Sequence, residues 1–447
     1  MSTTPARRLF GTDGVRGVAN AELTPELALS IGRALGTVLG GSGTVVIGRD
    51  TRRSGPMLEA ALAAGITAAG ADVRLVGVLP TPAIAEEVPA SGAAGGAIIS
   101  ASHNPFADNG IKLVGPDGFK LADAQEAAVE AAMEADADRP VGAALGTIAA
   151  DDDARGRYIG ALCARFPTRL DGVRVVIDCA NGATVATAPE ALGLLGATVI
   201  VTHADPDGVN INADCGSTHL GSLQRAVVAE GADLGLAFDG DGDRVLAVDE
   251  AGAVVDGDQI LAILALWMKD AGRLPHQTVV TTTMTNLGFR RAMAERGVEV
   301  KWTDVGDRYV LAEMRRGGFV LGGEQSGHLI NLDSGPTGDG LATGLMLLDA
   351  LVEGGTRLAA AASVVTRLPQ KLVNVPGVRK AELADAKGVW DEVRAFEREF
   401  GEDGRVVVRP SGTEPLVRVM VEAPTADACD AWCARIADRV RKDLGGA

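Results

Sequence analysis

Three aspartates alternate with glycine in the segment Asp239-Gly240-Asp241-Gly242-Asp243. Their carboxylates can face one way while the glycines let the chain curl, and oxygen ligands at this spacing suit Mg²⁺ or Ca²⁺. Without a cation, charges so close together would raise each other's pKa. Glu250 falls at position twelve of an EF-hand loop, but Arg244 stands where that loop needs glycine. The segment therefore predicts a working metal site, with a solvated acidic turn as the plain alternative.

A second loop carries a serine, in the segment Ser100-Ala101-Ser102-His103-Asn104-Pro105. The apolar run before it, residues 96–99, predicts a short buried strand. Ligands of open α/β sheets bind at the carboxyl ends of strands, so this loop would present its side chains at such an end. Ser102 has His103 beside it and Lys112 ten residues further on. Taken alone, an ordinary turn explains this pair better than a catalytic role.

Two loops in the second half of the chain carry side chains suited to sugars and to phosphates. Glu324, Ser326 and His328 stand among glycines and could hydrogen-bond sugar hydroxyls, although a capping or buried polar role fits equally well. The segment Arg409-Pro410-Ser411-Gly412-Thr413 combines a cation, two hydroxyls and free backbone N–H groups, which is a good phosphate cradle. Arg418, on the strand that returns from this loop, could add a second charge.

A glycine-rich segment near the start of the chain, Phe10–Gly17, predicts a loop with unusual backbone dihedrals. Its Arg16 could reach an anion, and a plain turn is as good an explanation.

The elements that must position these loops alternate between strands and helices. Thr24 and Pro25 predict the start of a helix, and a strand follows from Thr44. The order strand, helix, strand, helix, strand predicts an α/β sheet with helices on both faces. Similar Val-rich strand openings recur at Thr44, Arg174 and Thr278, which indicates three α/β units of related design. From about Lys371 the pattern changes, which predicts a smaller C-terminal unit.

Composition sets limits on function. The 447 residues suffice for three or four domains of about 100–150 residues each. A formal charge of −17 argues against nonspecific nucleic-acid binding. The five cysteines form no C-x-x-C pair, so the sequence predicts neither a disulfide framework nor a structural zinc site. No signal segment and no apolar run of about 20 residues is present. We expect a cytoplasmic protein with no membrane partner.

In this order and spacing, the loops resemble those of the α-D-phosphohexomutase superfamily, and the likeness covers essentially the whole chain. Within the superfamily the sequence is most similar to the bacterial subgroup that acts on glucosamine phosphates. The segments that carry this likeness are Phe10–Gly17, Ile99–Pro105, Asp214–His219, Val305–Val310 and Gly323–His328. Relatives that act on mannose or glucose phosphates usually have Met in place of Gln325 and Lys in place of Arg308.

The resemblance implies an α/β fold of three related mixed-sheet domains plus a smaller C-terminal α+β domain around a central cleft. We place the domains at residues 1–154, 155–256, 257–370 and 371–447. It also implies the interconversion of glucosamine 6-phosphate and glucosamine 1-phosphate, on the way to UDP-N-acetylglucosamine. The substrate partner is a small sugar phosphate, and the protein would be a monomer or a homodimer.

Residue roles follow from the same resemblance. Ser102 would be carried as phosphoserine and would pass its phosphoryl group to the sugar phosphate, giving a hexose 1,6-bisphosphate that is both intermediate and activator. One Mg²⁺ would be held by Asp239, Asp241, Asp243 and a phosphoserine oxygen. The catalytic candidates beside Ser102 are Lys112, His328, His103, Arg244 and Arg16. The substrate-binding candidates are Glu324, Ser326, Arg308, Arg409, Ser411, Gly412, Thr413 and Arg418.

Three alternatives stay open. The nearest is a phosphomannomutase or phosphoglucomutase of the same superfamily, with the same chemistry on a neutral sugar. A metal-dependent sugar phosphatase would use the Asp239–Asp243 loop and release free phosphate. A sugar-phosphate binding protein without catalysis would leave the reactive serine and the metal loop without a role.

Overall fold

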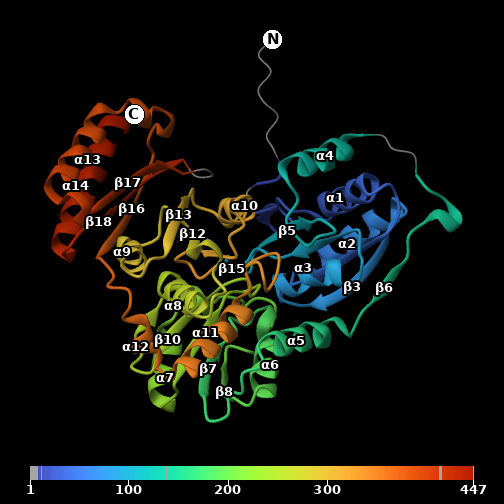
Figure 1. Cartoon of the computed structure of the whole chain (residues 1–447). Coiled ribbons are helices and arrows are strands. Elements are labelled where there is room, and N and C mark those ends of the chain that lie inside the picture. Colours follow the sequence, from blue (N-terminus) through green and yellow to red (C-terminus); the bar gives the residue numbers. More distant parts are fainter. Residues whose placement is uncertain (1–8, 12, 136–138, 412–414, 446–447) are drawn as a thin grey trace.

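Four β-sheets follow one another along the chain, each with its own helices (Figure 1). The computed structural model describes residues 9–11, 13–135, 139–411 and 415–445. The C-terminal unit lies at one side of the molecule and the N-terminal unit at the other, with the second and third units between them (Figure 1).

The first sheet has six strands in the order β1-β5-β4-β2-β3-β6. Thr24 caps the first helix as expected, because its hydroxyl accepts a hydrogen bond from the backbone N of Leu27. The strands are β1 (Val15–Val18), β2 (Thr44–Arg49), β3 (Asp72–Val78), β4 (Gly95–Ile99), β5 (Asp108–Val114) and β6 (Ile148–Ala150). The helices are α1 (Pro25–Val38), α2 (Gly55–Ala68), α3 (Thr81–Ala90) and α4 (Asp123–Glu134).

The second sheet has the order β11-β10-β9-β7-β8 and the third has the order β13-β12-β14-β15. Their strands are β7 (Arg174–Asp178), β8 (Thr198–Thr202), β9 (Leu234–Phe238), β10 (Val245–Asp249), β11 (Val254–Val255), β12 (Thr278–Thr282), β13 (Glu299–Thr303), β14 (Leu321–Gly323) and β15 (Leu329–Asn331). The helices of this part are α5 (Ala154–Arg165), α6 (Ala188–Leu194), α7 (Gly221–Glu230), α8 (Gly257–Asp270), α9 (Leu287–Glu295), α10 (Asp307–Gly317), α11 (Gly340–Gly354) and α12 (Leu358–Ala362).

The first three sheets share one topological core, which confirms the related design that the sequence predicts. The three Val-rich openings are β2, β7 and β12, and each lies between two parallel neighbours. In each sheet one of those neighbours then turns back into an antiparallel strand: β4 into β5, β9 into β10, and β14 into β15. The predicted serine, metal and sugar loops are these three connections, so each unit contributes the same loop.

The C-terminal unit is α+β, as expected. Its antiparallel sheet has the order β16-β18-β17. The strands are β16 (Gln370–Pro376), β17 (Arg405–Pro410) and β18 (Leu416–Glu422), and the helices are α13 (Lys387–Phe400) and α14 (Ala426–Leu444). Trp432 and Phe396 from the two helices meet edge to face within its core.

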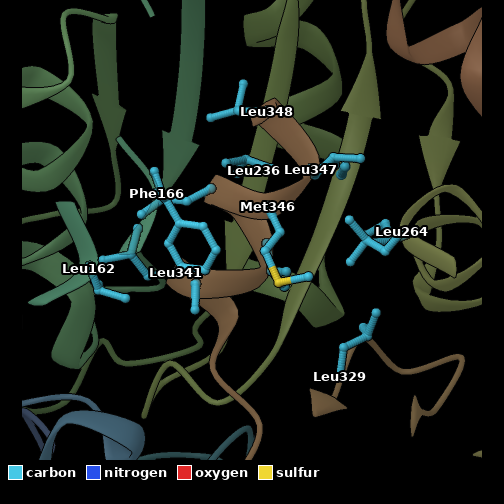
Figure 2. Packing of buried hydrophobic residues seen from close by; sticks show 14 of the residues in the cluster. Leu162, Phe166, Leu236, Leu264, Leu329, Leu341, Met346, Leu347 and Leu348 are labelled. Atoms are coloured by element: carbon cyan, nitrogen blue, oxygen red, sulfur yellow. The ribbon is translucent and has the colours of Figure 1, made fainter. Parts of the chain in front are cut away.

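One hydrophobic cluster reaches across the first three units, with helix α11 at its centre, while the C-terminal unit has a cluster of its own. Every residue of α11 from Gly340 to Leu351 is buried. Figure 2 shows its side chains between residues of several elements: Leu162 and Phe166 from the α5 region, Leu236 from β9, Leu264 from α8 and Leu329 from β15. Although it follows the third sheet in sequence, α11 packs on the second sheet through β9 and β10. The first three units therefore share buried apolar contacts.

The predicted domain boundaries and the central cleft stay predictions. In the described part of the chain, no helix combines the length and apolarity that crossing a membrane requires.

Asp339 ties the start of α11 to the metal loop and carries a perturbed carboxyl group. It caps α11 by accepting from the backbone N of Ala342, and the Tyr158 hydroxyl donates to its Oδ2 at 2.9 Å. The next residue, Gly340, donates its N–H to the carbonyl of Gly242. Burial, and next the charge of Glu86, raise the pKa of Asp339 to about 7.

We expect Asp339→Asn to change how stability depends on pH. Because the pKa of Asp339 is raised on folding, protonation contributes stability that is complete below about pH 4 and is lost as the pH rises through about 7. Asn keeps the cap but cannot ionise. Relative to the parent, Asp339→Asn should therefore gain about 2–3 kcal/mol in free energy of unfolding between pH 5 and pH 8. Urea unfolding at both pH values measures this, with the exposed Asp333→Asn as control. Parallel pH profiles for all three proteins would contradict it.

Candidate active site

The serine loop and the metal loop meet in one buried site. Ser102 follows β4 and is 1% exposed, and its hydroxyl donates to Oδ2 of Asp239 at 2.6 Å. Asp239 follows β9 of the second sheet. Two motifs that lie 137 residues apart in the sequence are thus in direct contact.

The metal loop places all three aspartates in the interior. Asp239, Asp241 and Asp243 are at most 5% exposed, and one oxygen of each lies within 4.8 Å of the others. Oδ1 of Asp241 and Oδ1 of Asp243 are buried without a hydrogen-bond partner. Burial, and next the charges of Asp243 and Asp241, raise the pKa of Asp239 well above its usual range. Buried carboxylates with unpartnered oxygens could hold a metal ion.

Cations surround this acidic loop. Lys112 lies on β5 opposite Ile98 of β4, which points its ammonium group to within 3.0 Å of Asp241 and 3.8 Å of Asp243. Burial opposes its charge, but Asp13, Asp241 and Asp243 hold the pKa of Lys112 above its usual range. The Arg244 Nε lies 3.7 Å from Asp243. Lys112 therefore keeps its proton at neutral pH.

Arg16 lies at the edge of the same group. It stands on β1 opposite Gly110 of β5, and its guanidinium forms an ion pair with Asp13. Asp13 also lies 3.5 Å from the ammonium group of Lys112. Arg16 thus belongs to the same charge network as the metal loop.

The two candidate histidines have opposite pKa shifts. Burial, and next the positive charges of Arg244 and Arg16, lower the pKa of His103 to about 4. Its Nδ1 lies 3.3 Å from the Ser102 hydroxyl. His328 is 2% exposed; burial opposes its charge, but Asp243 raises its pKa above the usual value. At neutral pH His103 is therefore a neutral proton acceptor, whereas the charge of Asp243 favours the protonated form of His328.

The sugar loop is placed beside the third unit's helix α10. Glu324 accepts a hydrogen bond from the backbone N of Gly306, which precedes that helix, and Ser326 is exposed. Arg308 in the first turn of α10 pairs with Asp123 of the first unit at 2.6 Å. Arg308 therefore links the third unit to the first, and its substrate-binding role stays a prediction.

The phosphate loop forms a second cluster, on the C-terminal sheet. Arg409 of β17 and Arg418 of β18 stand directly opposite each other. Burial, and next the charge of Arg418, lower the pKa of Arg409. Like charges opposite each other on a sheet are unfavourable, and an anion between them would relieve the repulsion. Ser411 is buried, while Gly412 and Thr413 lie outside the described residues.

Several residues of the site escape sequence reasoning. Arg52 is fully buried, pairs with Asp50 at 2.9 Å and donates to the carbonyls of Ser102 and Asn104 through its Nη2. Asn212 donates to the Ser102 carbonyl as well. These bonds hold Ser102 in the left-handed region, at φ 52°. The one sign of these contacts in the sequence is that the predicted strand from Thr44 ends in charged residues.

Lys120 and Thr81 are further residues that no motif contains. Lys120 bridges Asp13 of the first unit and Asp307 of the third, at 2.6 Å each. Thr81, at the start of α3, donates its hydroxyl to Oδ2 of Asp241 at 2.7 Å. Both contacts join segments far apart in the chain, so local sequence carries no sign of them.

We expect Arg52→Met to destabilise the protein strongly. The change leaves Asp50 buried without its charged partner and the serine loop without its donors, and such losses typically cost about 3–5 kcal/mol. Arg53→Met, at the exposed neighbouring arginine, is the matched control. Urea unfolding measures both free energies. If the two variants are equally stable, the clamp on the serine loop has no energetic role.

Comparison with known proteins agrees with this arrangement. Models of the phosphoglucomutase/phosphomannomutase family match the whole length in succession: alpha/beta/alpha domain I at residues 7–140, domain II at 157–252, domain III at 256–368 and the C-terminal domain at 372–439.

Individual proteins are similar over nearly the whole chain as well. A phosphoglucosamine mutase from Saccharopolyspora erythraea is 56% identical over 97% of this chain and 99% of its own. One from Rhodococcus jostii is 55% identical over 93% of this chain and 95% of its own. A crystal structure of a phosphoglucomutase/phosphomannomutase family protein from Burkholderia thailandensis superposes with a TM-score of 0.81, at 27% identity over 98% of this chain and 96% of that one. With its four matched domains and its serine beside the aspartate triad, the chain belongs to the phosphoglucomutase/phosphomannomutase family.

Proposed function

We propose that the protein interconverts glucosamine 6-phosphate and glucosamine 1-phosphate through a phosphoserine and a 1,6-bisphosphate, as an isomerase of the phosphotransferase type. The relatives named phosphoglucosamine mutase, more than half identical over nearly their whole length, support the choice of substrate. The observation that carries the chemistry is the contact between the Ser102 hydroxyl and Asp239, inside a buried acidic loop. A serine in this position suits phosphoryl transfer, which needs positioning and charge neutralisation above all.

In this proposal Ser102 carries the phosphoryl group. The bond between its oxygen and phosphorus breaks while the free hydroxyl of the sugar phosphate forms a new bond to phosphorus, and the hydroxyl proton is passed on to the released Ser102 oxygen. The resulting 1,6-bisphosphate turns around and returns its other phosphoryl group to Ser102, which releases the isomeric monophosphate. The enzyme ends phosphorylated as it began, so no phosphate is consumed.

The donor set fits Mg²⁺. The three buried carboxylates of the metal loop, two of them with an unpartnered oxygen, are hard ligands, and a phosphoserine oxygen would complete the set. When bound there, Mg²⁺ would neutralise charge on the transferring phosphoryl group. Lys112 and Arg244 flank the same aspartates and would steady the group from the protein's side.

Proton transfer is assigned from the pKa shifts. Lys112 stays protonated, so it would act as a fixed cation. His103 is neutral at pH 7 and its Nδ1 lies 3.3 Å from the Ser102 oxygen, which suits a proton acceptor. His328, with its raised pKa, would serve as the general acid when the reaction runs the other way. These pKa shifts favour His103 over Lys112 as the general base.

Substrate binding would divide between two clusters. Glu324 and Ser326 would bind sugar hydroxyls in either orientation. Arg409, Ser411 and Arg418, with Gly412 and Thr413, would hold the phosphate that is not reacting. Arg308 would reach substrate only after leaving Asp123, so we regard it as a residue that joins two units first. The cytoplasmic location and the monomeric or dimeric state stay predictions.

We expect a clear preference for the amino sugar in a substrate comparison. Glucosamine 6-phosphate, glucose 1-phosphate and mannose 1-phosphate are turned over side by side, with Mg²⁺ and a catalytic amount of the matching hexose 1,6-bisphosphate, and products are quantified by chromatography. Turnover of glucosamine 6-phosphate should exceed that of both neutral sugars. A preference for a neutral sugar would indicate a phosphoglucomutase or a phosphomannomutase with the same chemistry. Stoichiometric release of inorganic phosphate would favour the phosphatase instead.

Ser102→Ala is the matched variant in this comparison. It removes one hydroxyl and leaves the aspartates in place, so it should fold normally and lose turnover of all three sugars by at least about a thousandfold. Ser91→Ala, at the end of α3, is the control. Full activity of Ser102→Ala would exclude a phosphoserine.

A further inference from the structure

A second group of metal-ligating side chains lies in the middle unit, outside the metal loop. Asp178 is the last residue of β7, His203 follows the neighbouring strand β8, and Cys215 belongs to the loop before α7 (Figure 1). One ligand atom from each lies within 4.8 Å of the other two. The proposed phosphoryl transfer uses none of the three.

The side chains of this group lie close together, but one of their nitrogen atoms lacks a hydrogen-bond partner. Nδ1 of His203 lies 3.0 Å from Oδ2 of Asp178, yet it is buried and has no partner in hydrogen-bond geometry. Asp178 is fully buried and is oriented by the backbone N–H groups of Ala180 and Gly216, each at 2.9 Å. Cys215 is fully buried as well. A carboxylate oxygen and an imidazole nitrogen this close together need only a small side-chain rotation to reach the spacing of two ligands on one cation.

The backbone around the group is unusually strained. Of the nine non-glycine residues with positive φ in the described chain, five belong to these loops: Ala180, Asn181, His203, Asn212 and Asp214. A left-handed conformation costs roughly 1–2 kcal/mol for an ordinary residue, and alanine has no side chain to offset it. Such strain persists only where the surroundings hold it in place. Hydrogen bonds already join these segments, from the backbone N of Asn181 to the His203 carbonyl and from the backbone N of Asn212 to the Ala180 carbonyl, and a shared metal ion would hold them further.

We propose that Asp178, His203 and Cys215 bind a divalent transition metal of borderline softness, with zinc as the physiological ion. Thiolate, imidazole and carboxylate together are a zinc set, unlike the all-oxygen metal loop. Tetrahedral zinc places such ligand atoms about 3.3–3.6 Å apart. The three ligand atoms lie within 4.8 Å of one another, so small side-chain rotations would bring them to this spacing. A water would take the fourth position.

The site would act as a support for the active site. Asn212 links this group to the serine loop. Its backbone N donates to the Ala180 carbonyl, and its side chain donates to the Ser102 carbonyl. The backbone N of Ala183 donates to the carbonyl of Gly240 in the metal loop. A metal that joins the segments around Asp178 and Cys215 would therefore also hold in place the residues that contact the serine loop and the metal loop.

Cobalt substitution tests the proposal on the intact protein. Metal is removed with a chelator, Co²⁺ is titrated in, and near-ultraviolet absorption from a thiolate-to-cobalt transition is recorded. We expect one such site per chain, with the band displaced by Zn²⁺. Cys215→Ser should abolish the band, and His203→Ala should weaken Zn²⁺ binding by about tenfold or more in competition with a chromophoric chelator.

Two control variants separate this site from other sources of signal. Cys163→Ser removes a partly buried cysteine elsewhere in the unit and should leave the band unchanged. Asp239→Asn disrupts the metal loop and should also leave it unchanged. The parent protein decides the matter even if Cys215→Ser fails to fold. The proposal is overturned if the parent protein shows no thiolate band and binds only the zinc that Asp239→Asn abolishes.

Discussion

The structure depends on keeping three carboxylates and a serine hydroxyl together out of water. Such a group is unfavourable unless positive charge balances it. Lys112, Arg244 and His328 approach Asp241 and Asp243 from three different segments, while Asp239 meets the serine. The protein as a whole is strongly acidic, so this balance is local. A cation in the loop would complete it, and the same charge arrangement is what a moving phosphoryl group needs.

The repeated architecture explains how this arrangement is built. Each of the first three sheets turns from a parallel strand into an antiparallel one at the same topological position, and each such turn carries a functional loop. Helix α11 and the hydrophobic cluster around it hold the first three units together. Lys120 adds a polar link, because it joins Asp13 of the first unit to Asp307 of the third. The site thus forms where three equivalent loops are directed toward one another.

The sequence predicts what is local. The serine and aspartate loops, the strand openings at Thr44, Arg174 and Thr278, and the helix start at Thr24 are contiguous patterns, and the structure confirms the fold class they indicate. The contacts of Arg52 and Asn212 with the serine loop could not be predicted, because they reach backbone carbonyls that lie 50 or more residues away in the sequence. Cys215 could not be assigned for the same reason: its two neighbours come from separate strand ends. The roles of the site residues stay proposals.

The most direct test of the account follows the phosphoryl group itself. Protein phosphorylated at Ser102 with isotopically labelled phosphate is mixed with one equivalent of glucosamine 6-phosphate, and the reaction is stopped within a single turnover. The account predicts that the label leaves Ser102 and appears first in glucosamine 1,6-bisphosphate, then in glucosamine 1-phosphate where turnover is completed, or on Ser102 again where the intermediate reverts. Label that appears as inorganic phosphate, or that stays on Ser102 while product forms, would contradict it.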